Sequence, residues 1–237
     1  MLVVLGGRVL ANTVDLILRH GGYVRRFEIA AKGASAAIAA WKPRLLLLDI
    51  DLEAGAGIEL INEARAGGPI GIIALTRRSD LRGKLDAFER GADDYIGVPF
   101  VPDDLIARTR AVLLRTQGDK SEFVPRQRIG ELEIDVLSRT VLVRDREVHL
   151  TSLEQALLYL LAANDGIVLT REEILDALWG TDFVSASNVV DWHVRGLRAK
   201  LEHDTRTPRY IETVPRTGYR FVSGPSVQAN RPVSPVR

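Results

Sequence analysis

An aspartate at the end of the most apolar run of the sequence is one candidate for chemistry. Asp49 follows the run Leu45–Leu48, which indicates a buried β-strand. In a doubly wound sheet the carboxyl ends of the parallel strands line the ligand-binding crevice. We therefore expect the Asp49 carboxylate to lie in such a crevice. Asp51 and Glu53 follow on the same loop, and we interpret them as solvated loop residues.

A second candidate is a segment near the C-terminus with a helical pattern and a basic side. Between Ser187 and His203 the apolar residues are spaced by 4, 3 and 4 positions, at Val190, Val194, Leu197 and Leu201. This spacing predicts one buried helix face. The other side carries Asn188, Trp192, Arg195 and Ala199, with Arg198 and Lys200 beside them. A helix with such an outer face fits the major groove of DNA.

The distribution of charge favours a local surface for a polyanion. The net charge of the chain is only +1, but residues 185–223 carry +3 and residues 129–184 carry −7. Positive charge concentrated in one segment indicates a polyanion-binding face. An ordinary solvated helix remains the alternative, because charge alone does not separate the two.

The composition excludes several classes of protein. A hydrophobic content of 46% beside 27% charged residues excludes wholesale disorder. The chain has no cysteine, which rules out disulfides and zinc–thiolate sites and favours a reducing cytosol. No apolar run approaches the roughly 18 residues of a membrane span, and Met1–Leu5 indicates a first strand, not a signal peptide. We expect a cytoplasmic protein with no membrane segment, metal or cofactor.

The elements that would position Asp49 alternate between strands and helices over residues 1–115. Helical patterns such as Val9–His20, which we expect Gly21-Gly22 to end, separate short apolar runs. The predicted strands are Leu2–Leu5, Tyr23–Phe27, Leu45–Asp49, Ile70–Leu75 and Asp94–Gly97. This order predicts an α/β domain with a doubly wound parallel sheet. Residues 116–128 lose the periodicity and are predicted to be a linker.

Residues 129–223 are predicted to form a second, α+β domain. Strand alternation over residues 129–150 precedes helical patterns at Ser152–Asn164, Arg171–Trp179 and roughly Ser187–His203. A final hairpin pairs Tyr210–Val214 with Tyr219–Val222. The two last helices and the hairpin indicate a helix-turn-helix with a wing. Residues 224–237 are rich in Pro, Ser and Val, which predicts a disordered tail.

At these residues a resemblance to a known family becomes specific. Segment 150–222 is similar to the winged helix of OmpR/PhoB-type response regulators, through the motifs LTSLEQALLYLLAANDGIVLTREEILDALWG, VVDWHVRGLRAKL and RYIETVPRTGYRFV. The resemblance implies a sequence-specific transcription factor whose third helix enters the major groove and whose wing reaches the minor groove. The implied phosphate contacts are Trp179, His193, Arg195, Arg198 and Tyr219, and the implied base contacts are Asn188, Val189 and Trp192.

The hairpin and the end of the helix complete the implied DNA-binding set, with Lys200, Thr213, Arg216 and Thr217. Gly196 departs from the family, which often has a base-reading arginine there, and Pro215-Arg216 stands where Arg-Gly is common. Gly196 lies one turn after Trp192, so we expect it to leave room for the indole in the groove. A structural alternative stays open for four of these residues. Trp179 and Tyr219 could be core aromatics, His193 a packed histidine, and Trp192 a buried side chain.

Residues 1–115 resemble the receiver domain of the same family, which has a flavodoxin-like fold. The matching residues are Pro43, Leu45–Asp49, Gly57, Thr76, Gly91–Tyr95 and Pro99-Phe100. The resemblance makes Asp49 the phospho-acceptor position, and Thr76 and Tyr95 the switch positions. It also implies carboxylates that hold Mg²⁺ after the first strand, where this chain has Leu5-Gly6, and a lysine where it has Val98. Arg77 replaces a small residue. We therefore expect Asp49 to stay unphosphorylated.

The same resemblance implies partners. Active receivers of the family pair through cross-subunit ion pairs, and the matching positions are Lys84 with Asp104, Asp94 with Arg108, and Asp93 with Arg115. We expect a receiver-mediated homodimer without phosphorylation, or alternatively only a solvated surface. Duplex DNA with direct repeats, RNA polymerase at the loop Gly180–Ala186, and a sensor kinase are the other implied partners.

Three further interpretations of residues 1–115 stay open. One is a conventional two-component regulator phosphorylated at Asp49. Another is an altered crevice that senses a small molecule. The last comes from the enzyme class, since Gly6-Gly7 with Glu28 faintly resembles a dinucleotide-binding loop, although its spacing is not G-x-G-x-x-G. We expect that the protein is not an enzyme.

Overall fold

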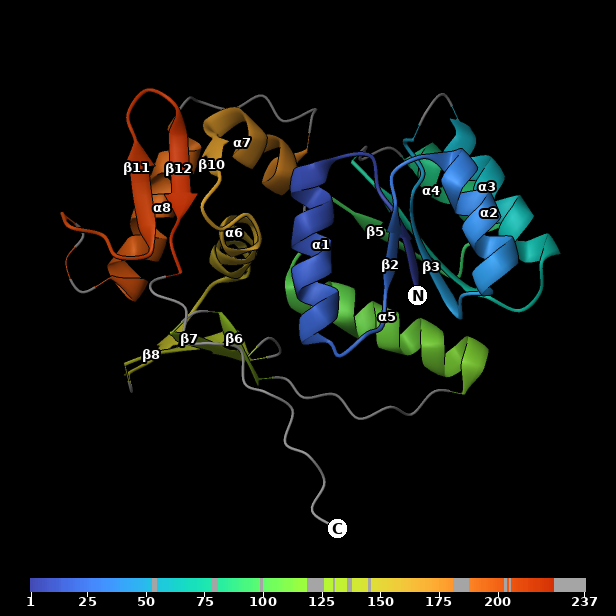
Figure 1. Cartoon of the computed structure of the whole chain (residues 1–237), viewed down its shortest axis with the longest axis horizontal. Helices are drawn as coiled ribbons and strands as arrows, with labels where there is room; N and C mark the ends of the chain where they lie inside the picture. The colour runs from blue at the N-terminus through green and yellow to red at the C-terminus, as the bar shows by residue number, and fades with distance from the viewer. Residues whose placement is uncertain are drawn as a thin grey trace, which may run out of the picture.

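The computed structural model describes residues 1–52, 55–77, 81–98, 100–118, 126–129, 131–135, 138–144, 146–180, 188–202, 204 and 206–223. The first domain is a five-stranded parallel sheet in the order β2-β1-β3-β4-β5 (Figure 1). Its strands are β1 Leu2–Val4, β2 Arg26–Glu28, β3 Leu45–Asp49, β4 Gly71–Thr76 and β5 Asp94–Gly97. Its helices are α1 Arg8–His20, α2 Ala31–Trp41, α3 Ala56–Ala66, α4 Leu81–Glu89 and α5 Pro102–Gln117. The doubly wound parallel fold is as predicted.

Helices cover both faces of this sheet, which explains why its central strands are apolar throughout. Along β3, Leu45 and Leu47 pack with α1 and α5, while Leu46 and Leu48 pack on the other face with α2 and α3. All four leucines are buried. The order of β1, β3 and β4 brings the carboxyl ends of these strands to one edge, where Asp49 and Thr76 stand.

The second domain begins with a four-stranded antiparallel sheet, β6 Arg126–Ile129, β7 Leu132–Asp135, β8 Thr140–Val143 and β9 Arg146–His149. The helices α6 Ser152–Ala163, α7 Arg171–Trp179 and α8 Val189–Leu201 follow. A three-stranded sheet in the order β10-β12-β11 completes the wing, with β10 Val168–Thr170, β11 Ile211–Val214 and β12 Gly218–Phe221. Capping boxes at Thr151 with Glu154 and at Thr170 with Glu173 fix the starts of α6 and α7.

Several predicted boundaries differ from the structure. The second strand lies at Arg26–Glu28 instead of Tyr23–Phe27, because Tyr23 still closes the end of α1 through a bond from its N–H to the Leu18 carbonyl. Gly22, with φ of 73°, takes the left-handed turn there. Helix α5 continues to Gln117 and β6 begins at Arg126, so both ends of the predicted linker lie in regular elements. The predicted tail, residues 224–237, lies outside the described residues.

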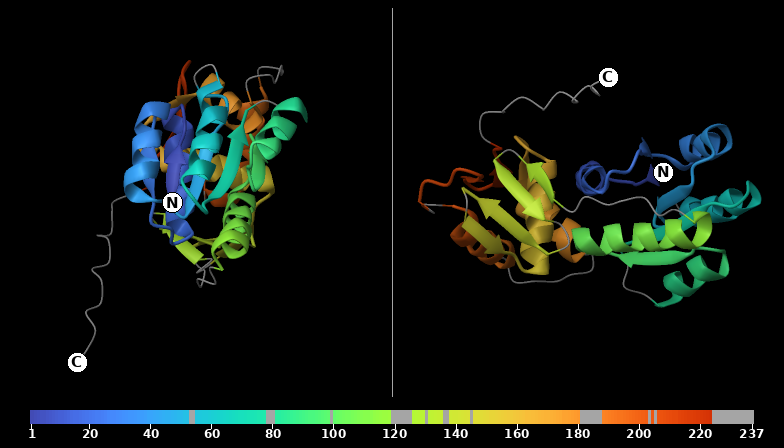
Figure 2. Two further views of the ribbon diagram at one scale, coloured as in Figure 1. Left: turned by 90° about the vertical axis from the view of Figure 1, so that its right-hand side faces the viewer. Right: turned by 90° about the horizontal axis from the view of Figure 1, so that it is seen from below.

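The two domains lie side by side and share a packed boundary (Figures 1 and 2). Helix α1 lies against α6, and their buried side chains belong to one continuous apolar cluster. Two polar pairs join the helices. Asn12 donates from Nδ2 to Oδ1 of Asn164 at 2.9 Å, and His20 Nδ1 lies 3.0 Å from the Tyr159 hydroxyl. The sequence did not predict this boundary. Within the described part of the chain, none of the helices is long and apolar enough to cross a bilayer.

Candidate nucleic-acid interface and receiver crevice

Helix α8 presents a buried and an exposed side, as its spacing predicts. Val190, Val194, Leu197 and Leu201 are at most 4% exposed. They belong to the apolar cluster that also contains the buried residues of α6. The outer side carries Asn188, Trp192 and Arg195, all exposed. Helix α8 itself lies on the other side of α6 from α1 and the receiver (Figure 1). A flat or grooved partner can therefore reach it.

Trp192 is the largest exposed side chain on α8, with 70% of its surface accessible. Its ring meets His193 edge-on, with centroids 4.7 Å apart, and His193 lies 5.3 Å from the ring of Trp179. The open alternative that Trp192 is buried is therefore excluded. His193 and Trp179 are half-buried, and His193 lies between the rings of Trp192 and Trp179. Burial also lowers the pKa of His193, so it is neutral near pH 7.

A side chain at Gly196 would face α6 in the free protein. A Cβ at this position would lie 3.4 Å from Oε1 of Glu154 on α6, not beside the indole of Trp192. This is an ordinary van der Waals distance, so an alanine would also fit between α8 and α6. Lys200 adds to the same contact, because its Nζ lies 2.6 Å from Glu154 Oε2. Lys200, predicted to bind DNA, thus joins two helices.

Tyr219 and Arg198 also form hydrogen bonds within the winged-helix domain. Tyr219 is 4% exposed, and its hydroxyl donates to Asp191 Oδ1 at 2.8 Å, which Arg171 also holds at 2.7 Å. Burial and the Asp191 carboxylate raise the pKa of Tyr219. Arg198 donates from Nε and Nη2 to the Ile211 carbonyl at 3.0 and 2.6 Å. Both side chains therefore tie α8 to the wing.

The wing keeps its predicted contact residues at the surface. Thr213, Arg216 and Thr217 are exposed, although Thr213 Oγ1 also accepts a bond from Arg198 at 2.8 Å. Arg216 has a φ of 62° in the turn between β11 and β12. Val189 is half-buried at the first turn of α8. The predicted polymerase loop, Gly180–Ala186, lies outside the described residues apart from Gly180.

In the receiver, Asp49 ends β3 at the carboxyl edge of the sheet and is 2% exposed. Its Oδ2 is 3.5 Å from Arg77 Nη2, and its Oδ1 accepts the N–H of Asp51 at 2.9 Å. Burial raises the pKa of Asp49, against the effect of these two neighbours. The arginine that replaces a small residue therefore supplies the counter-charge to the buried carboxylate.

Asp51 is not the solvated residue that we expected. Its Oδ2 accepts from the Thr76 hydroxyl at 2.7 Å and from the Arg77 N–H at 2.8 Å. It is half-buried at the edge of the sheet. Glu53, given the same interpretation, lies outside the described residues. The sequence did not show that Asp51 would meet the hydroxyl of Thr76, which lies 25 residues later at the end of the next strand.

The residues around Asp49 do not fit a magnesium ion. Leu5 and Gly6 stand where a second carboxylate is needed, and a Cβ on Gly6 would lie only 2.8 Å from the Leu52 side chain. The buried Val98 offers no charge. Among the described residues, no three His, Asp or Glu side chains gather in a way that could hold a metal ion.

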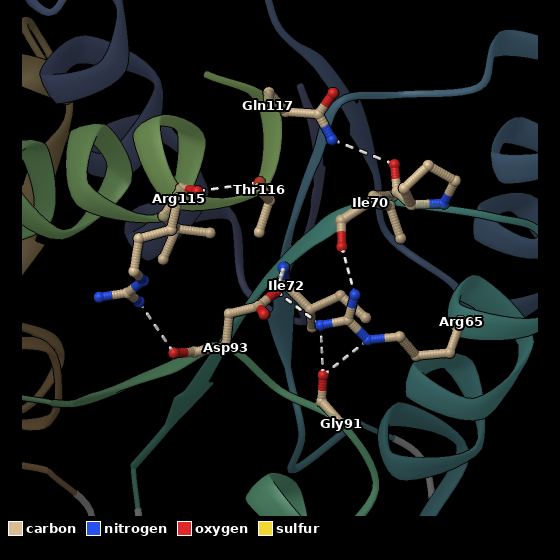
Figure 3. Close-up of polar contacts among 10 residues, drawn as sticks. Arg65, Ile70, Ile72, Gly91, Asp93, Arg115, Thr116 and Gln117 are labelled. Atoms are coloured by element: carbon tan, nitrogen blue, oxygen red, sulfur yellow. Dashed lines mark hydrogen bonds and ion pairs between the residues drawn. The ribbon is translucent and has the colours of Figure 1, made fainter. Parts of the chain in front are cut away.

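The charged residues predicted to pair across a dimer mostly have contacts within the chain. Arg108 binds Asp94 at 3.0 Å and Asp104 at 2.8 Å. Figure 3 shows Asp93, whose Oδ2 is held by Arg65 at 2.6 Å and whose carbonyl accepts from Arg115 at 3.1 Å. Two of the predicted pairs, Asp94 with Arg108 and Asp93 with Arg115, therefore already meet within one chain.

On the same face, the Nζ of Lys84 lies 4.9 Å from the centre of the Tyr95 ring. Tyr95, the predicted aromatic switch position, is half-buried on β5. Lys84 therefore contacts the predicted switch residue Tyr95. Its predicted partner, Asp104, binds Arg108 instead.

A parallel α/β domain that ends in an aspartate-lined crevice, followed by a winged helix with an exposed third helix, defines a response regulator. The sequence comparisons agree. Residues 2–110 match the model of the response regulator receiver domain, and residues 145–221 match that of the transcriptional regulatory protein C-terminal domain. The chain belongs to the OmpR/PhoB-type response regulators.

Similar proteins cover most of the chain. The DNA-binding response regulator MtrA of Mycolicibacterium smegmatis is 35% identical over 89% of this chain and 91% of its own length. KdpE of Escherichia coli, the KDP operon transcriptional regulatory protein, is 37% identical over 76% of this chain and 80% of its own. Among solved structures, the response regulator DrrB of Thermotoga maritima is 30% identical and covers 93% of this chain and 97% of its own, with a TM-score of 0.44.

Proposed function

We propose that the protein is a sequence-specific DNA-binding regulator of transcription that acts as a dimer without phosphorylation, and not as an enzyme. One observation carries the DNA-binding part. The outer side of α8, with Asn188, Trp192 and Arg195, is exposed while the receiver is packed on α6. The recognition surface is thus accessible without separation of the domains.

The receiver crevice supports independence from phosphate. Phosphoryl transfer to a carboxylate needs positive charge around the transferred group, usually from a metal ion. Here the Arg77 guanidinium already faces the Asp49 carboxylate, and the Thr76 hydroxyl already donates its hydrogen bond to Asp51. A conventional regulator phosphorylated at Asp49 is the alternative that these contacts disfavour. A sensor kinase could then bind the receiver but would not transfer a phosphoryl group to Asp49.

One experiment separates the two. The full chain is incubated with acetyl phosphate and Mg²⁺, and its intact mass and its affinity for selected genomic DNA are measured. We expect no added phosphoryl group and an unchanged Kd, and Asp49→Ala should bind DNA nearly as well as the parent. A phosphoryl group at Asp49 accompanied by tighter DNA binding would establish the conventional mechanism. Footprints on the selected DNA test whether the sites are direct repeats.

An apolar patch supports a dimer through the receiver. Leu85 and Phe88 lie one turn apart on α4 and are 53% and 47% exposed, and Leu114 on α5 is 50% exposed. Arg108 on α5 and Asp94 on β5 form a charged pair in the same domain, and a two-fold axis would present each pair to its copy. Phe88→Glu is the better test variant, because Arg108→Glu would also break contacts within the chain.

Sedimentation at tens of micromolar, at low and high salt, measures this association. We expect a dimer for the parent and a monomer for Phe88→Glu. Ile167→Glu, at a similarly exposed apolar residue of the winged-helix domain, is the matched control and should remain dimeric. If the parent is monomeric at low salt, this face does not assemble the regulator. Contacts with RNA polymerase are proposed for the loop 180–186.

A further inference from the structure

A cavity of about 610 Å³ lies in the winged-helix domain, and its lining residues have no part in the proposed function. It is formed where the β8–β9 hairpin meets the end of α8 and the chain that leads into β11. Arg144 and Arg146 line it from the hairpin, and Arg209 lines it from the chain before β11. A cavity of this volume can hold a small molecule. Three arginines from two distant segments therefore border one space of molecular size.

These arginines have few anionic partners. Arg144 makes no hydrogen bond or ion pair with any other described residue. Arg146 donates from Nη2 to the Lys200 carbonyl at 2.7 Å, and this acceptor is neutral. Of the three arginines, only Arg209 has a carboxylate partner among the described residues, Glu131. A guanidinium carries five N–H donors, so most donors of the set are available to a ligand. An anion between these like charges would relieve their repulsion.

The acidic residues that line the cavity are already engaged by their own loop. Glu202 is 6% exposed, and its carboxylate accepts the three consecutive backbone N–H groups of residues 209–211, at 2.7–3.0 Å. Asp204 accepts a backbone N–H and a threonine hydroxyl from two and three residues later, at 2.9 and 3.0 Å. These bonds fix the loop that carries Arg209. They also leave fewer carboxylate lone pairs to compete with a ligand for the arginines.

The position of Arg144 is unusual for the turn that it occupies. Val143 pairs with Arg146, so the β8–β9 hairpin has a two-residue turn, and Arg144 is its first residue, with a φ of 47°. Turns of this length favour asparagine, aspartate or glycine, because these residues adopt positive φ most readily. An arginine therefore gives the turn no conformational advantage. What it adds is a positive charge beside the cavity.

We propose that this cavity binds a small anion with two or more negative charges, a phosphorylated or polycarboxylate molecule, through Arg144, Arg146 and Arg209. The planar guanidinium matches pairs of phosphoryl or carboxylate oxygens. A concave lining suits a small molecule better than the backbone of a DNA duplex. The bound anion would join the β8–β9 hairpin to the end of α8. The inference goes beyond the proposed function, because it requires neither DNA nor a dimer.

Calorimetric titration of the full chain with pyrophosphate and with citrate tests the proposal. The buffer holds the ionic strength at about 0.15 M and contains no magnesium, which would bind pyrophosphate. We expect one anion per chain with a Kd below about 0.1 mM, and a higher melting temperature in its presence. Tighter binding of pyrophosphate assigns the site to a phosphorylated molecule, and tighter binding of citrate assigns it to a polycarboxylate.

A pair of matched variants locates the site. Arg144→Gly suits the positive φ, so it should fold and melt at least as high as the parent, but bind pyrophosphate at least about tenfold more weakly. Arg216→Gly is the control, because Arg216 has a φ of 62° in the exposed turn of the wing, outside the cavity. It should keep the parent's Kd for pyrophosphate. Both variants lose one positive charge, so a difference between them reports the place of the charge.

Three results would overturn the proposal. One is that neither anion binds at millimolar concentration, and another is that Arg144→Gly keeps the parent's Kd. The third is an equal loss in both variants, which would mean a diffuse attraction to a basic surface. The titrations contain no DNA and no acetyl phosphate. Failure of the proposed function therefore leaves their result as it stands, and a failed titration leaves the proposed function untouched.

Discussion

At the scale of single residues, the predicted DNA-binding set divides into residues that face outward and residues that hold the domain together. Trp192 and Arg198 are six positions apart on α8, yet the indole is 70% exposed and the guanidinium is bound to the Ile211 carbonyl. The two substitutions should therefore differ in kind. Because the Trp192 side chain is exposed, its substitution should change DNA recognition. Because Arg198 is bound to the wing, its substitution should also change the stability of the fold.

Trp192→Ala should relax base preference at one or two positions, by about 1–3 kcal/mol each, and leave the melting temperature nearly unchanged. The indole makes few contacts within the protein but can reach thymine methyl groups in the groove. Competition binding with singly substituted sites measures the preference. Trp41→Ala removes an exposed tryptophan from α2 of the receiver and should leave the base preference unaltered. An equal loss on all sequences would mean that Trp192 does not contact bases.

Arg198→Ala should instead weaken binding to all sequences alike and also lower stability, by about 1–3 kcal/mol. It leaves the Ile211 carbonyl and the Thr213 hydroxyl without their donor, so the wing loses its tie to α8. Thermal melting and the same competition assay measure both effects. Full stability with a selective loss at one base pair would make Arg198 a base-reading residue.

At the scale of elements, the sequence predicted which face of a helix is buried, but it did not predict which element that face packs against. The 4-3-4 spacing of α8 predicted its buried face, and the apolar runs of β1, β3 and β4 predicted a sheet covered on both sides. The partner of α1 in the other domain could not be predicted, since amphipathic spacing identifies a face and not its neighbour. The contacts of Asp51 with Thr76 and Arg77 were not predicted for a related reason. The backbone geometry of the loop decides where such a short side chain points, and the sequence does not reveal it.

The α1–α6 boundary should weaken in acid. Burial, with the Arg19 charge, lowers the pKa of His20 to about 4, so His20 is neutral beside Tyr159 at pH 7. A histidine with a lowered pKa stabilises the folded state fully above about pH 6.5, its unfolded value, and loses that contribution as pH falls toward 4. The melting temperature of the parent should fall over this window more steeply than that of His20→Gln. Parallel curves would show that His20 is not coupled to folding.

At the scale of the whole molecule, the packed receiver and the accessible recognition helix coexist. Helix α6 lies between α1 on one side and α8 with the wing on the other (Figure 1). The domain boundary and the DNA surface are therefore on opposite sides of the second domain. This arrangement leaves the outer side of α8 uncovered, so we expect regulation to act through assembly and not through steric cover.

The cysteine-free sequence allows a direct test of this arrangement. Asn12 and Asn164 touch across the boundary at 2.9 Å, so Asn12→Cys/Asn164→Cys introduces the only two thiols, which a mild oxidant can join directly as a disulfide. Because the bridge fixes the packed state and α8 faces away from it, the cross-linked protein should bind DNA within about twofold of the unbridged variant, well under the tenfold change that 1.4 kcal/mol would produce. The singly substituted Asn12→Cys, treated alike, controls for the reagent. A cross-linked protein that no longer binds DNA would mean that the domains must separate first, and the packed state would then be the inhibited one.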